Sequence, residues 1–234
     1  MRKLTGLCFL TATLLAGAVH AQGVFIEQGD PSAISAAAVY DYRSNATLGG
    51  SAAFGYTYRG VLDMGLSFSA FKYSGGDNSP LVAWWFKPYI AWHAIRSDVM
   101  EGMPVSIAFG FGFEKRFYTG NDPYANPDGY AAEPGMSIYR RMEMGSLVFA
   151  PEVYLADDIS YTRYYSKAQD QPSGNKRSDN GYGFSTTTDY MGGIALLRAN
   201  LMFKSAKGDT GLIVLPYAGY KAGLTAGIGV GALF

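Results

Sequence analysis

The residues of this chain best suited to chemistry are charged side chains of both signs that fall within stretches of alternating apolar residues. They are Asp63, Lys87, Glu114, Arg116, Arg141, Glu143, Glu152, Arg198 and Lys204. Charged groups enclosed in a protein must pair with one another, because an isolated buried charge is very costly. We therefore predict that these residues form a paired polar network. The alternative is that the same groups line a narrow pore for small polar solutes.

Motifs for catalysis or metal binding do not occur in the sequence. It contains no HExxH, GxSxG, P-loop or CxxC pattern. His93 is the only histidine beyond the first 21 residues, and one histidine defines neither a metal site nor a catalytic triad. We expect His93 to be structural, and we expect no catalytic residue, no metal and no cofactor.

The first 21 residues have the features of a secretory signal peptide. Two basic residues precede a short apolar core, and small residues lead up to Gln22. The pattern predicts cleavage before Gln22 and export of residues 22–234 as a single domain, with a retained single-span anchor as the alternative. Cleavage would remove Cys8, the only cysteine, and with it any disulfide framework.

The composition narrows the class of the exported chain. Charged residues make up 16% of the sequence, which also holds 18 Tyr and 14 Phe. Two of the 19 basic residues lie in the predicted leader, so the exported part has a net charge of −2 against 19 acidic residues. No basic stripe suggests a nucleic-acid partner. No later stretch is apolar enough for a transmembrane helix, so the remaining way to span a membrane is a closed barrel.

Period-two alternation points to such a barrel. In residues 104–118 one face carries the large apolar side chains, namely Val105, Ile107, Phe109, Phe111 and Phe113. The opposite face holds glycine, alanine and serine before its charges begin. A soluble barrel would present a mixed, charged face to water. We therefore predict that the apolar stripe faces lipid and that the small and charged residues face an enclosed lumen.

Ten such strands are expected, so the predicted fold is an all-β, closed, antiparallel transmembrane β-barrel, with eight or twelve strands as alternatives. The strands are 33–42, 47–58, 61–74, 80–95, 104–118, 135–144, 147–165, 188–206, 210–220 and 223–234. With both termini periplasmic, the two longest connections, 119–134 and 166–187, fall on the outer side, as in bacterial outer-membrane barrels. Strand 135–144 places Arg140 on the same side as Ile138, so we expect it to be bulged, shifted or only partly embedded.

The last residues resemble the C-terminal sorting signal of Gram-negative outer-membrane β-barrel proteins. Alternating apolar residues run from Leu224 to a terminal aromatic, with Phe234, Ala232, Val230 and Ile228 on one face. The resemblance implies insertion in the outer membrane by the barrel assembly machinery of that membrane. It also implies contact with outer-membrane lipids and lipopolysaccharide.

Loops 119–134 and 166–187 are the predicted binding surface, because loops on a rigid scaffold often carry binding. Tyrosines in or beside them provide large amphipathic contacts. They are Tyr118, Tyr124, Tyr130, Tyr164, Tyr165 and Tyr182. We expect these loops to act in envelope structure or in binding an extracellular ligand or host surface. The alternative is an aromatic girdle at the outer interface.

A third hypothesis is a lipid A-modifying enzyme. Residues 71–84 and 215–223 faintly resemble stretches of the lipid A palmitoyltransferase family. Where that family has an Asp-Ser pair after Phe-Lys, this chain has Tyr73-Ser74, so the acid is missing. The strand prolines Pro88, Pro151 and Pro216 are a second similarity, since prolines remove ladder donors and mark bulges or lateral openings.

Overall fold

The computed structural model describes residues 23–43, 48–73, 81–119, 128–167, 182–206, 210–221 and 223–234. These residues form eleven β-strands. The strands are β1 (Ala33–Arg43), β2 (Leu48–Tyr58), β3 (Leu62–Tyr73), β4 (Leu81–Ile95), β5 (Ser106–Thr119), β6 (Asp128–Tyr139), β7 (Met142–Met144), β8 (Leu147–Lys167), β9 (Tyr182–Lys204), β10 (Gly211–Lys221) and β11 (Leu224–Leu233). No helix within the described residues is both long and apolar enough to cross a membrane.

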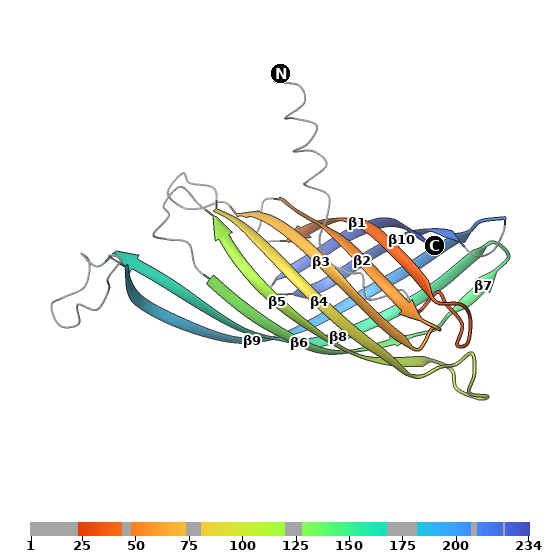
Figure 1. Ribbon diagram of the computed structural model, residues 1–234. Helices are drawn as coiled ribbons and strands as arrows, with labels where there is room; N and C mark the ends of the chain where they lie inside the picture. The colour runs from red at the N-terminus through yellow and green to blue at the C-terminus, as the bar shows by residue number, and fades with distance from the viewer. Residues whose placement is uncertain are drawn as a thin grey trace, which may run out of the picture.

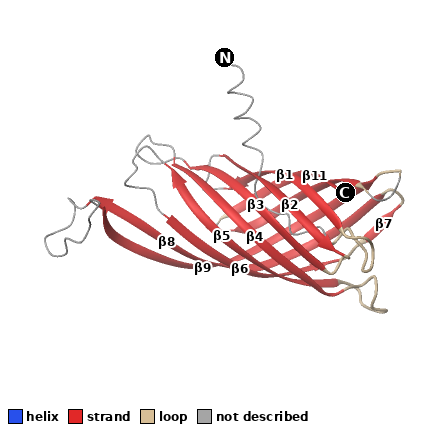
Figure 2. Ribbon diagram, in the orientation of Figure 1, coloured by secondary structure: helices blue, strands red, loops and turns tan. Residues whose placement is uncertain are grey.

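The strands close into a single antiparallel barrel (Figures 1 and 2). β1 pairs with β11, from Ser35 opposite Leu233 to Arg43 opposite Thr225, and this pairing joins the two ends of the chain. β6 and β7 both pair with β8, one after the other, so together they form one position in the ring. The barrel therefore has ten strand positions, which confirms the predicted fold class.

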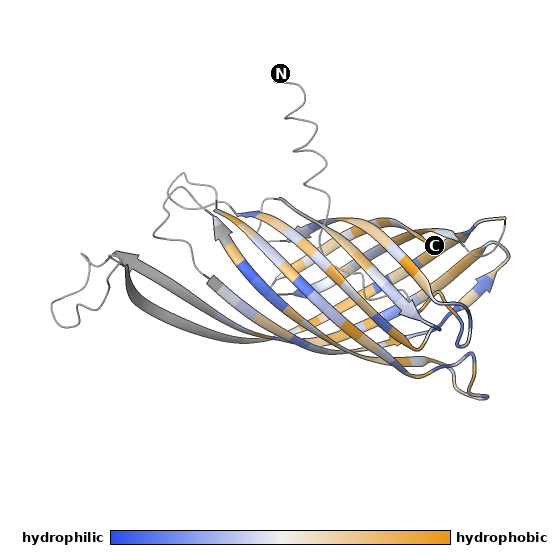
Figure 3. Ribbon diagram, in the orientation of Figure 1, coloured by the Kyte–Doolittle hydropathy of each residue, from blue (hydrophilic) through white to orange (hydrophobic). Residues whose placement is uncertain are grey.

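The alternation of β5 runs in the predicted direction. Phe109, Phe111 and Phe113 are 49%, 48% and 43% exposed on the outside of the barrel, whereas Ala108 and Glu114 are buried inside it. Large apolar side chains are likewise exposed on other strands, among them Phe54, Trp92 and Ile228, and hydropathy varies from residue to residue along the strands (Figure 3). Closure leaves no sheet edge within the wall, so backbone groups are satisfied between strands as a lipid environment requires.

Glycines on the lumen face make room for large aromatic neighbours. A Cβ added at Gly227 would lie 2.4 Å from the ring of Tyr217, and one at Gly65 would lie 2.3 Å from the hydroxyl of Tyr89. Tyr217 and Tyr89 are the cross-strand partners of these two glycines. The glycine-rich inner face of the last strand therefore lets lumen side chains fill the interior.

The two ends of the barrel differ, and we name them by what they carry. The turn end holds both ends of the described chain and the short connections at 59–61, 145–146 and 205–210, with a longer turn at 96–105. The arm end holds the opposite connections, where β8 and β9 are the longest strands, with 21 and 23 residues (Figure 1).

Several strand boundaries differ from the sequence prediction. β6 begins at Asp128 rather than at residue 135, so Pro134, whose type suggests a turn, lies inside the strand. β8 continues to Lys167 and β9 begins at Tyr182, so residues at both ends of the expected loop 166–187 belong to strands. β6 ends before Arg140 and β7 starts after Arg141, so the irregularity expected near Arg140 is a break between two strands.

The three strand prolines singled out from the sequence all lie at gaps in the ladders. The β4–β5 pairs skip from Phe86 to Tyr89 around Pro88. The β9–β10 pairs skip from Val214 to Tyr217 around Pro216. Pro151 lies in a continuous β8–β9 ladder, but on its other side it falls between the β7 pairs and the β6 pairs of β8. The register is unchanged across these gaps, so the prolines interrupt hydrogen bonding without forming bulges.

Residues 23–32, here called the N-terminal segment, enter the mouth of the barrel at the turn end with residues 23–26, while residues 27–32 are exposed. Val24 and Phe25 are 1% and 2% exposed. They belong to a buried apolar cluster with wall residues that include Tyr139 and Met202. The lumen therefore has an apolar core at the turn end.

Candidate functional site

Buried charges fill the middle of the lumen, beyond the apolar core. Glu133 on β6 forms ion pairs with Lys87 on β4 and Lys221 on β10. Glu133 is 1% exposed. Strands from different sides of the ring thus meet at one carboxylate across the interior.

A second group of charges lies on β5 and β8. Arg116 pairs with Glu114 two residues earlier on β5. It also donates to both oxygens of Asp158 on β8, at 3.0 and 3.2 Å. The guanidinium carbon of Arg116 lies 5.1 Å from the ring centre of Trp85, which is close enough for a cation–π contact.

A third group is centred on Glu152 of β8. Arg198 donates to Oε1 of Glu152 at 2.8 Å, and Asn200 donates to Oε2 at 2.8 Å. The Ser137 hydroxyl donates to Oε1 as well. The guanidinium of Arg198 also lies 4.3 Å from the ring centre of Tyr154. Each charge in these groups therefore has a partner, which is the condition for burying it.

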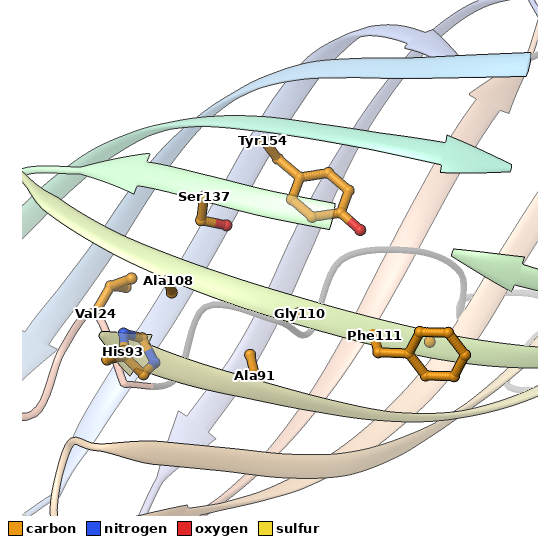
Figure 4. A pocket seen from close by; sticks show the side chains of 9 residues that line it. Val24, Ala91, His93, Ala108, Gly110, Phe111, Ser137 and Tyr154 are labelled. Atoms are coloured by element: carbon orange, nitrogen blue, oxygen red, sulfur yellow. The ribbon is translucent and has the colours of Figure 1, made fainter. Parts of the chain in front are cut away.

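The three groups leave little free space. Their four cations and four carboxylates balance in charge. A cavity beside them has a volume of about 10 Å³ and is lined in part by Val24, His93, Ser137 and Tyr154 (Figure 4). That volume holds about one water molecule. Among the described residues, paired side chains from six strands meet across the lumen at this level.

His93 lies between this cavity and the N-terminal segment. Its Nε2 is 3.0 Å from Oδ2 of Asp63, and its Nδ1 is 2.7 Å from the hydroxyl of Tyr139. Asp63 also accepts hydrogen bonds from the Thr57 hydroxyl at 2.7 Å and from the Gly23 amide at 2.9 Å. With Nε2 donating to Asp63, Nδ1 accepts from Tyr139. The carboxylate thus holds both the histidine and the start of the N-terminal segment.

Arg96, on the longer turn after β4, fixes the N-terminal segment. It is 2% exposed. Its guanidinium donates to the carbonyls of Gly23 at 3.0 Å and Ile26 at 2.5 Å, and to that of Gly60. Arginine provides five N–H donors in a rigid fork, which suits it to bind several carbonyls at once.

Asp98 completes this anchor. Its carboxylate accepts from Arg96 at 2.8 and 2.9 Å and from the Gln28 amide at 3.0 Å. Burial opposes ionisation of Asp98, but the hydrogen bonds from Arg96 and Gln28 outweigh it and hold the pKa of Asp98 below its ordinary value.

At the rim of the turn end, Arg141 and Lys204 share the carboxylate of Glu143. Arg141 also pairs with Glu27 of the N-terminal segment. These contacts are more exposed than those of the mid-lumen groups, since the side chains of Glu27 and Glu143 are 49% and 40% accessible.

The nine charged residues singled out from the sequence thus lie in distinct places. Lys87, Glu114, Arg116, Glu152 and Arg198 belong to the mid-lumen groups. Asp63 lies beneath the N-terminal segment, and Arg141, Glu143 and Lys204 form the rim. Sequence reasoning missed Glu133, Asp158 and Lys221 as partners. The signal for Asp158 was present, because it has the same strand parity as Glu152.

Of the six tyrosines expected in or beside the loops, the structure describes the side chain of Tyr130. Tyr130 is 43% exposed on the outer wall, where the ammonium of Lys115 lies 3.8 Å from its ring centre. For four other tyrosines the structure describes only the backbone, which belongs to a strand in each case. They are Tyr118, Tyr164, Tyr165 and Tyr182. Tyr124 lies outside the described residues.

The exterior decides the class of this barrel. Large apolar side chains stand exposed all around the wall, among them Phe54, Trp92, Phe109, Leu197 and Ile228. The C-terminal Phe234 and Val230 are on this outer surface, 63% and 47% exposed. Such a surface on a closed antiparallel ring is that of a chain surrounded by lipid. The protein is a transmembrane β-barrel of the outer-membrane type.

Solved structures of outer-membrane barrels resemble this chain in overall shape. The translocator domain of the autotransporter NalP from Neisseria meningitidis is 10% identical, with a TM-score of 0.47 over 88% of this chain and 89% of that one. The β domain of the Bordetella autotransporter BrkA is 12% identical, with a TM-score of 0.45 over 88% and 99%. LpxR from Salmonella typhimurium is 9% identical, with a TM-score of 0.41 over 87% and 99%.

These values are too low to transfer any activity to this barrel. No protein-family model and no curated protein matches the sequence.

Proposed function

We propose that this protein is a surface-binding barrel of the outer membrane, with a closed lumen and both termini on the periplasmic side. Its role is to hold the β8–β9 hairpin outside the membrane, where the hairpin binds an extracellular ligand or surface. A cleaved signal peptide and the barrel assembly machinery would bring it there. The proposal assigns it binding rather than catalysis or solute transport.

The observation that carries this proposal is the unequal length of neighbouring strands at the arm end. β10 reaches β9 only as far as Ile194, opposite Lys221. The β8–β9 pairs continue to Lys167 opposite Tyr182. Residues 182–193 of β9 therefore extend past the end of β10, by about 40 Å along the strand at ~3.3 Å per residue. We call these residues, with the facing part of β8, the arm (Figure 1).

Membrane crossing does not need this length. A transmembrane strand takes about 9–11 residues, whereas β9 has 23. The edge of β9 that faces away from β8 has no partner strand at 182–193 within the described residues. Free strand edges can add an extended peptide as a further strand. An arm of this kind suits binding of an extended polypeptide segment.

The filled lumen supports binding over transport. The mid-lumen groups leave a cavity of about 10 Å³, and the N-terminal segment occupies the mouth at the turn end. The Asp63–His93 pair, which resembles part of a catalytic triad, lies under Gly23 and is fully buried. No substrate reaches it while the N-terminal segment is in place.

A peptide array tests the proposal. Refolded protein in detergent micelles is applied to immobilised 15-residue peptides of varied sequence, beside a variant in which residues 163–190 are replaced by a short Gly-Ser turn. We expect a subset of peptides to capture the intact protein and the shortened variant to lose that capture at least tenfold. Equal capture of both proteins, or of neither, contradicts the assignment to the arm.

Planar-bilayer recording tests the closed lumen separately. We expect no conductance steps from the intact barrel or from the shortened variant. Steady single-channel steps that change in Arg116→Gln or Arg198→Gln would favour a narrow pore and overturn the proposal.

A further inference from the structure

The lipid-facing wall carries a preformed hollow near the arm end. It has a volume of about 530 Å³ and extends over β8, β9, β10, β11 and β1. Ligand pockets in proteins commonly measure roughly 300–1,000 Å³. The hollow is distinct from the lumen and from the arm.

Strand register explains how the hollow forms. One row across the wall pairs Leu197 with Ala218, Ala218 with Ala226, and Ala226 with Tyr42. The next row toward the arm end pairs Ala195 with Tyr220 and Tyr220 with Leu224. Three alanines thus fall next to one another and form a floor. This floor is recessed relative to the larger outward side chains beside it, which are Leu197, Tyr220 and Leu224.

The walls of the hollow are tall apolar or aromatic side chains. Leu224 and Leu197 are 71% and 65% exposed, and Tyr42 and Tyr220 are 53% and 50% exposed. The residues that line the hollow carry no charged side chain. Tyrosine rings at this level match an aromatic girdle, in which the ring contacts acyl chains and the hydroxyl reaches the headgroup layer.

The position of the hollow indicates what fills it. It is continuous with the apolar exterior that contacts lipid and lies beside the β10–β11 turn, at the end opposite to Phe234. With the termini periplasmic, as proposed above, that end faces the outer leaflet. Lipopolysaccharide is the lipid of that leaflet, and its acyl chains have the chemistry of the lining.

We propose that this hollow is a binding site for one acyl chain of an outer-leaflet lipopolysaccharide molecule. The acyl chain lies on the floor of Ala195, Ala218 and Ala226. Leu197 and Tyr220 flank it, and it covers the apolar surface of these residues. A recessed site buries more of an acyl chain than a convex wall does, so the bound lipid exchanges more slowly than its neighbours.

Native mass spectrometry of the refolded, full-length mature barrel tests this inference with purified hexa-acylated lipid A as the probe. The test variant is Ala218→Leu/Ala226→Leu, which fills the floor. The control is Ala36→Leu/Ala38→Leu, a matched pair of changes on the outward face of β1 several residues away from the hollow. Outward alanines face no packed core, so each variant is expected to fold, and heat-modifiable gel mobility verifies this.

We expect one retained lipid A per barrel in the intact protein and in Ala36→Leu/Ala38→Leu, and at least a tenfold lower retained fraction in the filled variant. Equal retention in all three proteins overturns the site. Retention of phosphatidylethanolamine in place of lipid A, in a competition with equal amounts of both, overturns the assignment to lipopolysaccharide. Peptide capture by the arm is expected to be unchanged in the filled variant, so this site and the proposed function can fail independently.

Discussion

The turn end and the arm end of this barrel are built by opposite means. At the turn end, most connections are short and the N-terminal segment enters the mouth, where Arg96, Arg141 and Asp63 bind it. At the arm end, β9 continues past β10 beyond Ile194 and β8 continues past β6 beyond Arg163, so their last residues pair with each other. Stability is thus concentrated at one end, and exposed backbone at the other.

This contrast shows how one scaffold can separate rigidity from binding. The mid-lumen groups lie between the two ends and join β4, β5, β6, β8, β9 and β10 through paired charges. Low-stability segments are where binding elements are commonly found. We expect perturbations to become less costly from the lumen, through the turn end, to the arm, and the predictions below follow that order.

The largest loss of unfolding free energy is expected from Arg198→Met, in the lumen. The change leaves the carboxylate of Glu152, which is 3% exposed, without its cation. Breaking a buried ion pair costs about 3–5 kcal/mol. Urea unfolding of the barrel in lipid vesicles, followed by tryptophan fluorescence, measures the loss.

The double variant Glu152→Gln/Arg198→Met is the matched control for that experiment. Glutamine can still accept from Asn200 and carries no charge, so we expect most of the stability to return. A double variant that is no more stable than Arg198→Met would show that this pair contributes through packing rather than charge.

The next effect is expected at the turn end, from Arg96→Met. The variant frees the carbonyls of Gly23 and Ile26, and we expect about 2–4 kcal/mol of destabilisation of the docked N-terminal segment, from several hydrogen bonds to a charged group. A nitroxide label attached at Gln28→Cys, in a protein with Cys8 changed to serine, measures the release of the N-terminal segment. We expect its electron paramagnetic resonance spectrum to show a mobile label in Arg96→Met. Arg59→Asn, an exposed contact to the Gly29 carbonyl at the same end, should leave the label immobile.

A smaller effect is expected when acid weakens the same anchor through Asp98. Its folded pKa lies below the ordinary value of about 3.9. The stabilisation is therefore complete above that pH and is lost as the pH falls through the folded pKa. We expect the label at residue 28 to become more mobile only below about pH 4.

The variant Asp98→Asn checks that assignment. It removes the titrating group, so the spectrum should change less between pH 7 and pH 3 than in the parent protein. An acid response of the same size in both proteins would assign it to a carboxylate other than Asp98.

The sequence was sufficient for the architecture because the alternation of strands such as β5 is local. Each outward phenylalanine could be read from its neighbours two residues away. It was insufficient where local residue types conflict with the tertiary arrangement. Pro134 suggests a turn, yet it lies inside β6, and that error concealed Glu133 as the partner of Lys87 and Lys221.

The anchor of the N-terminal segment could not be predicted for a different reason. Residues 23–32 have no periodicity, and Phe25 is buried only because the closed ring encloses it. Arg96 lies in a turn, where an arginine is usually solvated. Its role depends on carbonyls from residues 23, 26 and 60, and nothing in the sequence links these positions.

The smallest effect on stability is expected at the arm end. Replacing residues 168–181 with a short Gly-Ser turn removes only the connection of the arm, and a shorter loop lowers the entropic cost of closure slightly. We expect the unfolding free energy to stay within about 0.5 kcal/mol of the parent value. Gly145→Val provides the comparison at the turn end. Gly145 has φ of 63°, which a β-branched residue adopts only with strain, so we expect a loss of about 1 kcal/mol or more from that single change. If the shortened loop proves as costly as Gly145→Val, the two ends do not differ in the way that their strands indicate.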